Sequence, residues 1–65
     1  MKNDIKIDLI NNYLKERNLS KTQFCKLCKI SYSTLTNILN GDNFRLIALF
    51  KIAKILNIEV YQIFN

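Results

Sequence analysis

The sequence predicts an all-α protein, a single compact domain of five helices that spans residues 1–65. The chain has 65 residues, 49% of them hydrophobic, which is enough for one small packed domain and no more. It contains one Gly and no Pro, which argues against a turn-rich all-β fold. The apolar residues recur every three or four positions, as they do on one face of a helix.

The first predicted helix carries one apolar stripe, formed by Ile7, Ile10, Tyr13 and Leu14. Asn18 follows this stripe. Because Asn tolerates the left-handed backbone conformation that ends many helices, we expect the helix to end there.

A capping box begins the second predicted helix, because Ser20 is followed by Gln23 three residues later. The buried face of this short helix is predicted to consist of Phe24, Leu27 and Cys28. A tight break is expected at residues 29–30.

The third predicted helix, which Ser31 can cap, has two different faces. Its inner face is predicted to be Leu35, Ile38 and Leu39. Its outer face is polar, uncharged and able to form hydrogen bonds, and consists of Tyr32, Ser33, Thr36, Asn37 and Asn40. Two short helices joined by a tight turn cross steeply, so the second protrudes. A protruding helix with such a face fits the major groove of DNA, about 12 Å wide.

The last third of the chain is predicted to form two more helices after a turn at residues 40–43. The fourth helix runs over roughly residues 45–56, with a main stripe of Leu46, Leu49, Phe50, Ala53 and Leu56. Asn57 is a second left-handed cap candidate. The fifth helix, over residues 59–64, is short and presents Val60, Ile63 and Phe64.

The composition favours a binding protein over an enzyme. The chain has no His and only five acidic residues, too few for a self-contained active site with convergent polar groups, and no cofactor is expected. Ten basic residues give a net charge of +5, most of the excess lying in residues 20–45, which indicates a polyanionic partner. No apolar run approaches the ~20 residues of a membrane span, so we expect a cytoplasmic protein without a membrane partner.

Cys25 and Cys28 admit two interpretations. Their spacing suits a redox pair or half of a zinc site. However, zinc would require two chains, because there is no His and no second Cys pair. We favour the alternative, in which both are small buried apolar residues, and expect no metal.

The stretch from Leu19 to Gly41 resembles the helix-turn-helix of phage Cro/C1 repressors and Xre-type regulators. The likeness rests on the order of the capping box, the Ser31 cap, the apolar spacing and the terminal Asn40-Gly41. Residues 49–56 and 57–64 resemble the fourth and fifth helices of the same family. The resemblance implies a lambda-repressor-like fold, with the helix-turn-helix at about residues 20–40, in a transcriptional regulator that binds double-stranded DNA.

The resemblance also implies which residues contact DNA. Four fall on base-reading positions of the third helix: Tyr32, Ser33, Thr36 and Asn37. Five fall at or near positions that contact the DNA backbone: Lys21, Ser31, Asn40, Asn43 and Arg45. The chain departs from the family in three ways. Lys29 replaces the Gly of the turn, the reading face has neither Arg nor Gln, and the loop after Gly41 is about one residue shorter.

Five apolar residues of the last third lie off the predicted main faces: Ile47, Ile52, Ile55, Val60 and Tyr61. They either close the core or form the interface of a homodimer that binds a pseudo-palindromic operator. Two other functions stay open: an antitoxin that also covers a toxin, and a protein-interaction module that has lost DNA binding. We expect a repressor.

A paired departure from the family links the first and third helices. Many relatives have an Arg in the first helix that pairs with a Glu just before Asn-Gly, and the matching residues here are Leu14 and Leu39. Because both are apolar, we expect them to touch in the core.

Overall fold

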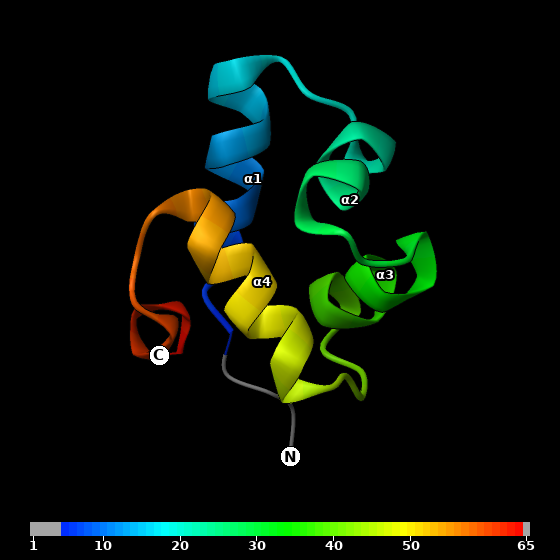
Figure 1. Ribbon diagram of the computed structural model, residues 1–65, viewed down its shortest axis with the longest axis vertical. Helices are drawn as coiled ribbons and strands as arrows, with labels where there is room; N and C mark the ends of the chain where they lie inside the picture. The colour runs from blue at the N-terminus through cyan, green and yellow to red at the C-terminus, as the bar shows by residue number, and fades with distance from the viewer. Residues whose placement is uncertain (1–4, 65) are drawn as a thin grey trace.

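The protein forms four α-helices and one short 3-10 helix in the computed structural model, which describes residues 5–64 (Figure 1). The elements are α1 Ile7–Arg17, α2 Lys21–Cys28, α3 Tyr32–Asn40, α4 Leu46–Leu56 and η1 Val60–Ile63. The described residues contain no strand, only an isolated antiparallel bridge between Ile5 and Phe64, so the all-α prediction is confirmed. Residues 1–4 and 65 of the predicted domain lie outside the described residues.

The short fifth helix predicted over residues 59–64 is present only as η1, a 3-10 helix of four residues, so the structure has four α-helices and not five. The chain is already extended at Phe64, with φ −84° and ψ 145°. The backbone N–H of Lys6 donates to the carbonyl of Ile63 at 2.7 Å, beside the Ile5–Phe64 bridge. At Ile63 and Phe64 the backbone thus pairs with the segment before α1 instead of continuing as a helix.

Every α-helix ends in a residue with left-handed backbone conformation: Asn18, Lys29, Gly41 and Asn57. The predicted caps at Asn18 and Asn57 are confirmed, with φ of 54° and 61°. At each of these ends the cap N–H donates back to a carbonyl of the last turn, which satisfies an otherwise orphaned acceptor.

The predicted N-terminal caps of α2 and α3 are also confirmed. The N–H of Gln23 donates to Ser20 Oγ at 3.1 Å, and the N–H of Ser20 donates to Gln23 Oε1 at 2.8 Å. The N–H of Thr34 donates to Ser31 Oγ at 3.1 Å. Such caps each contribute about 1 kcal/mol to stability. This contribution matters for α2 and α3, because helices of only eight and nine residues are marginally stable by themselves.

The core lies where α4, in the centre of Figure 1, packs against α2 and η1. All the elements contribute to it, and seven large side chains are fully buried: Phe24, Ile10, Leu35, Ile38, Leu49, Ile52 and Ile63. No polar or charged residue is buried among the described residues. The fold is therefore held by apolar packing, and its polar groups are left on the surface.

The predicted buried face of α2 is partly wrong, because Leu27 is 48% exposed while Cys25 is 5% exposed. The helix is rotated so that Phe24, Cys25 and Cys28 face the core. Helix α2 packs against α4, and Leu27 lies outside its buried face.

The predicted stripe of α4 is also partly wrong. Leu46 and Phe50 are 54% and 52% exposed, whereas Ala48 and Ile52 are buried. Nine of the eleven residues of this helix are apolar, so its periodicity did not identify the inner face. Ile52, which the sequence analysis assigned to the off-face group, belongs to the core.

Lys29 is, among the described residues, the one left-handed residue that is neither Gly nor Asn, with φ 59° and ψ 46°. The left-handed conformation costs a residue with a Cβ about 1–2 kcal/mol. We predict that Lys29→Gly raises the free energy of unfolding by about 0.5–1 kcal/mol, after the greater entropy of an unfolded Gly is subtracted. Chemical denaturation measures the change. Lys29→Ala is the matched control and should give no gain, since it removes the charge but keeps the Cβ.

Leu14 is 8% exposed and belongs to the core, and Leu39 is half-buried against the same core. Their mutual contact stays a prediction. Leu39→Glu should lower the free energy of unfolding by roughly 1–3 kcal/mol, because it brings a carboxylate to an apolar site without a partner. Adding Leu14→Arg should recover at least about 1 kcal/mol if the side chains touch. Thermal melts of the single and double variants measure the coupling, and strict additivity would show that the two residues do not meet.

Candidate nucleic-acid interface

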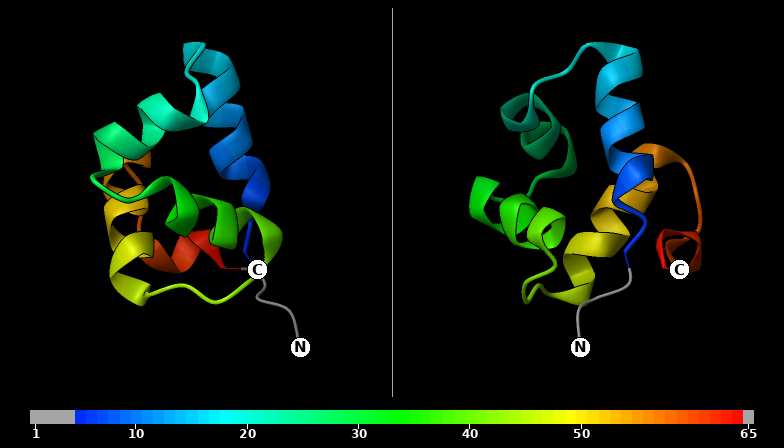
Figure 2. Two further views of the ribbon diagram at one scale, coloured as in Figure 1. Left: turned by 90° about the vertical axis from the view of Figure 1, so that its right-hand side faces the viewer. Right: turned by 180° about the vertical axis from the view of Figure 1, so that it is seen from behind.

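The outer face of α3 is a surface of hydroxyl, amide and phenol groups. The left view of Figure 2 looks at the molecule from the right-hand side of Figure 1, and α3 lies at the front of that view. Ser33, Asn37 and Asn40 are exposed, Tyr32 is 53% exposed and Thr36 is half-buried. None of the nine residues of α3 is charged. The outer face of α3 can therefore form hydrogen bonds, but it carries no charge.

Hydrogen bonds within α3 and its N-cap determine which hydroxyl groups can still donate or accept a hydrogen bond to a ligand. Thr36 Oγ1 donates to the carbonyl of Tyr32 at 3.0 Å, so its remaining capacity is that of an acceptor. Ser31 Oγ lies 3.2 Å from Ser33 Oγ and 2.8 Å from Thr34 Oγ1, and it accepts the N–H of Thr34. The exposed amide of Asn37 offers both a donor and an acceptor.

Three hydrogen bonds fix the turn that aims α3. The N–H of Ile30 donates to the carbonyl of Cys25 at 3.1 Å. Lys51 Nζ donates to the carbonyl of Lys29 at 3.3 Å, which joins α4 to the turn. The thiol of Cys25 donates weakly to the carbonyl of Ser31, at an Sγ–O distance of 3.7 Å. The start of α3 is therefore tied to both α2 and α4.

A groove of about 500 Å³ lies between α3, the turn before it and the start of α4. Four of the predicted DNA-contacting residues line it: Ser31, Asn37, Asn43 and Arg45. The other five do not line it. Lys21 is the exposed first residue of α2, Asn40 is the exposed last residue of α3, and Tyr32, Ser33 and Thr36 lie elsewhere on α3.

Two basic residues that the sequence analysis did not assign, Lys29 and Lys51, also line this groove. With Arg45 they give it three cations, and none of its eleven lining residues is acidic. Lys29 and Lys51 are 22 positions apart, so no spacing rule within one helix would have paired them.

Cys25 and Cys28 are free and buried, as predicted, at 5% and 3% exposure. Burial raises the pKa of both thiols. It brings the pKa of Cys28 to about 12, with the nearby Cys25 adding to the shift. The thiols therefore stay protonated at neutral pH, whereas metal ligation and redox exchange need the thiolate. Within residues 5–64 no group of three or more His, Cys, Asp or Glu residues could hold a metal ion.

No helix in the part of the chain that the structure describes is both long and apolar enough to cross a membrane. A family model described as helix-turn-helix matches residues 10–63. No curated protein and no solved structure matches the chain.

Proposed function

Because the chain belongs to the helix-turn-helix family, which indicates a DNA-binding regulator, we propose that it binds double-stranded DNA sequence-specifically as a cytoplasmic repressor, without enzymatic activity. One observation carries this proposal: α3 presents an exposed, uncharged, hydrogen-bonding face next to a groove lined by three cations. Base edges in the major groove are read by such polar groups, and phosphates are bound by cations.

The groups on α3 divide the reading of bases among them. Asn37 can pair with N6 and N7 of an adenine through its amide. Thr36, whose hydroxyl proton is already used within the helix, can accept from the amino group of cytosine or adenine. Tyr32, half of whose surface is exposed, can contact a thymine methyl group. Ser33 adds a hydroxyl near the start of the helix.

The flanking residues position the duplex rather than read it. Lys21 begins α2 with an exposed ammonium group, and Arg45 is the N-cap of α4. Ser31, Asn40 and Asn43 add neutral groups around α3, all exposed. These five residues are proposed to contact the DNA backbone, which gives affinity and register but no base preference.

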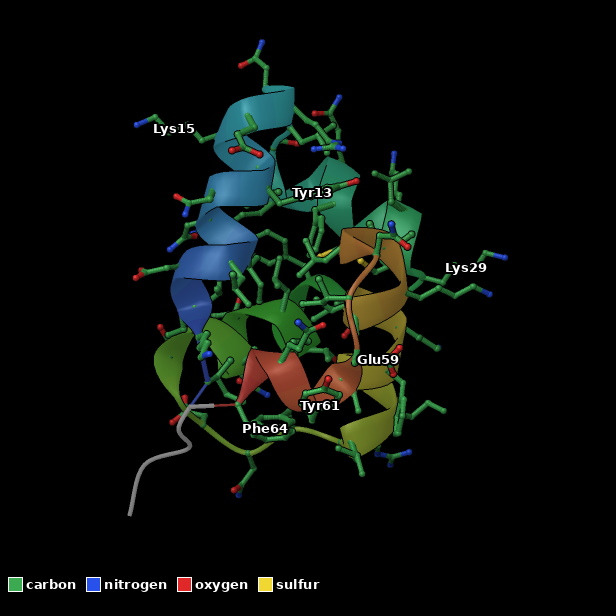
Figure 3. The ribbon with its side chains drawn as sticks, turned by 90° about the vertical axis from the view of Figure 1, so that its left-hand side faces the viewer. Tyr13, Lys15, Lys29, Glu59, Tyr61 and Phe64 are labelled. Carbon is green, nitrogen blue, oxygen red and sulfur yellow. The ribbon has the colours of Figure 1, made fainter. Side chains whose placement is uncertain are left out.

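We propose that a homodimer forms through the C-terminal third. The structure changes the residues proposed for its interface, because Ile52 is buried whereas Leu46 and Phe50 are exposed. Tyr61 on η1 is 71% exposed, and Phe64, which follows η1, is 38% exposed; the two are labelled near one another in Figure 3. On a pseudo-palindromic site such a homodimer would have to hold its two copies of α3 about 34 Å apart.

A second function, binding of a protein partner such as a toxin, is favoured by Leu27. This side chain is 48% exposed on α2, outside the C-terminal third, so the proposed dimer interface gives no reason for it. Neither Arg nor Gln stands on the outer face of α3, which also suits a module that has lost DNA binding. Failure to bind any duplex at low salt would select this function over the first.

Two substitutions separate base reading from backbone contact. Asn37→Ala should reduce the discrimination between the preferred site and random DNA by about 1–3 kcal/mol. Lys21→Ala should weaken binding to every sequence alike and reduce the slope of log K against log salt by roughly one unit. Titrations of both variants on the two duplexes over a range of salt measure these effects. Equal losses for Asn37→Ala on both duplexes would exclude its role in base reading.

Sedimentation equilibrium at high micromolar concentration tests the dimer, and we expect a mass near twice that of the monomer. Phe50→Glu should shift the protein to the monomer, because it places a carboxylate in the apolar interface. Leu27→Glu is the matched control: Leu27 is almost as exposed as Phe50 but lies on α2, so its substitution should leave the dimer intact. A monomeric parent protein that also binds its operator with one copy per site would contradict the homodimer.

A further inference from the structure

The groove between α3 and α4 carries more positive charge than the proposed backbone contacts use. Besides Arg45 it is lined by Lys29 and Lys51, and no acidic residue lines it. We propose that this groove is a phosphate-binding subsite for one DNA strand, in which Lys29 and Lys51 hold backbone phosphates beside the major groove that α3 enters. The inference rests on the proposed function and adds two contacts to it.

The hydrogen bond of Lys51 fixes one end of the subsite. Its Nζ lies 3.3 Å from the carbonyl oxygen of Lys29, across the turn between α2 and α3. An ammonium group has three donors, so two remain for phosphate oxygens. The same bond holds the ammonium close to the backbone of Lys29, whose own exposed side chain lines the groove. A long lysine side chain is therefore partly ordered before DNA arrives, which lowers the entropy cost of binding.

The spacing of the cations suits a strand better than a single anion. Arg45 is the N-cap of α4 and Lys51 is near its middle, six residues later, which corresponds to about 9 Å along the helix axis. A DNA strand carries its phosphates in succession, so cations this far apart can face different phosphates of one strand. A free anion would use only one end.

The position of the groove ties it to the reading face of α3. Asn37 and Ser31, at the outer face and the start of α3, also line the groove. A duplex that places base edges against α3 therefore brings a strand to the mouth of the groove. An acidic segment of a protein partner is the competing occupant, because it would match the same charges.

The experiment compares Lys29→Gln and Lys51→Gln with Lys15→Gln. Lys15 is an exposed residue of α1 and projects far from Lys29 in Figure 3, so the control removes the same charge at a distant place. Affinities are measured over a range of salt on the preferred duplex and on a random one. Each groove variant should lower the slope of log K against log salt by about 0.9. It should also weaken both duplexes by the same factor, roughly three- to tenfold at ~0.1 M salt, and Lys15→Gln should do neither.

A second variant at Lys51 distinguishes the loss of a phosphate contact from a folding defect. Lys51→Arg keeps a charged donor and should retain the parent slope, while thermal melts report any loss of the bond to the Lys29 carbonyl. Inorganic phosphate titrated into the free protein is the probe for a single anion, which a subsite for a strand should bind only weakly. Binding of phosphate to the parent but not to the groove variants, with an unchanged duplex slope in those variants, would mark a site for free phosphate and overturn the proposal.

Two further results decide between this subsite and its alternatives. Groove variants that change the slope no more than Lys15→Gln, while Lys21→Ala still does, overturn the subsite and leave the proposed function intact. Oligoglutamate is the probe for an acidic partner. If it binds the parent but not the Lys29→Gln/Lys51→Gln double variant, and the duplex slope is unchanged, the groove belongs to a protein partner. A parent protein that binds no duplex at all overturns both proposals together.

Discussion

The left-handed backbone at Lys29 is the constraint on which the position of α3 depends. A residue with φ 59° and ψ 46° reverses the chain within one step, so α3 can cross α2 instead of continuing it. The conformation is unfavourable for a lysine, and the surrounding contacts compensate for it. Caps at Ser20 and Ser31 define where the two helices start, and Lys51 donates to the carbonyl that the turn leaves exposed. The turn is thus held from α2, from α3 and from α4.

The ends of the helices could be predicted from the sequence, but their inner faces could not always be. An end depends on local chemistry: a hydroxyl at Ser20, an amide at Asn18 and a Gly at position 41 act on backbone groups a few residues away. A face depends on which neighbour approaches. In α4 the pattern allows several inward faces, and the small Ala48 is buried whereas the larger Leu46 is exposed. In α2, likewise, the small Cys25 is buried and the larger Leu27 is exposed.

The part of the candidate interface that lies within α3 could be predicted from the sequence. The groove between α3 and α4 could not, because it depends on tertiary packing. Tyr32, Ser33, Thr36 and Asn37 lie within six positions of one helix, so the order of caps and apolar residues already places them on its outer face. The groove is different, because it forms only when α4 packs across the turn before α3. Its two added cations come from segments 22 residues apart, and the charge count of residues 20–45 includes only one of them.

Helix α4 presents two different edges, so the proposed phosphate subsite and the proposed dimer interface can both lie on it. Residues 47 and 51 are one turn apart and line the basic groove, while residues 46 and 50, also one turn apart, do not line it and are exposed. The two pairs are rotated by about 100° around the helix axis. A second copy that covers Leu46 and Phe50 therefore leaves Lys51 accessible to a strand. The proposed dimer interface and the proposed phosphate subsite are therefore compatible, and the rigid helix that carries both would fix the distance between them.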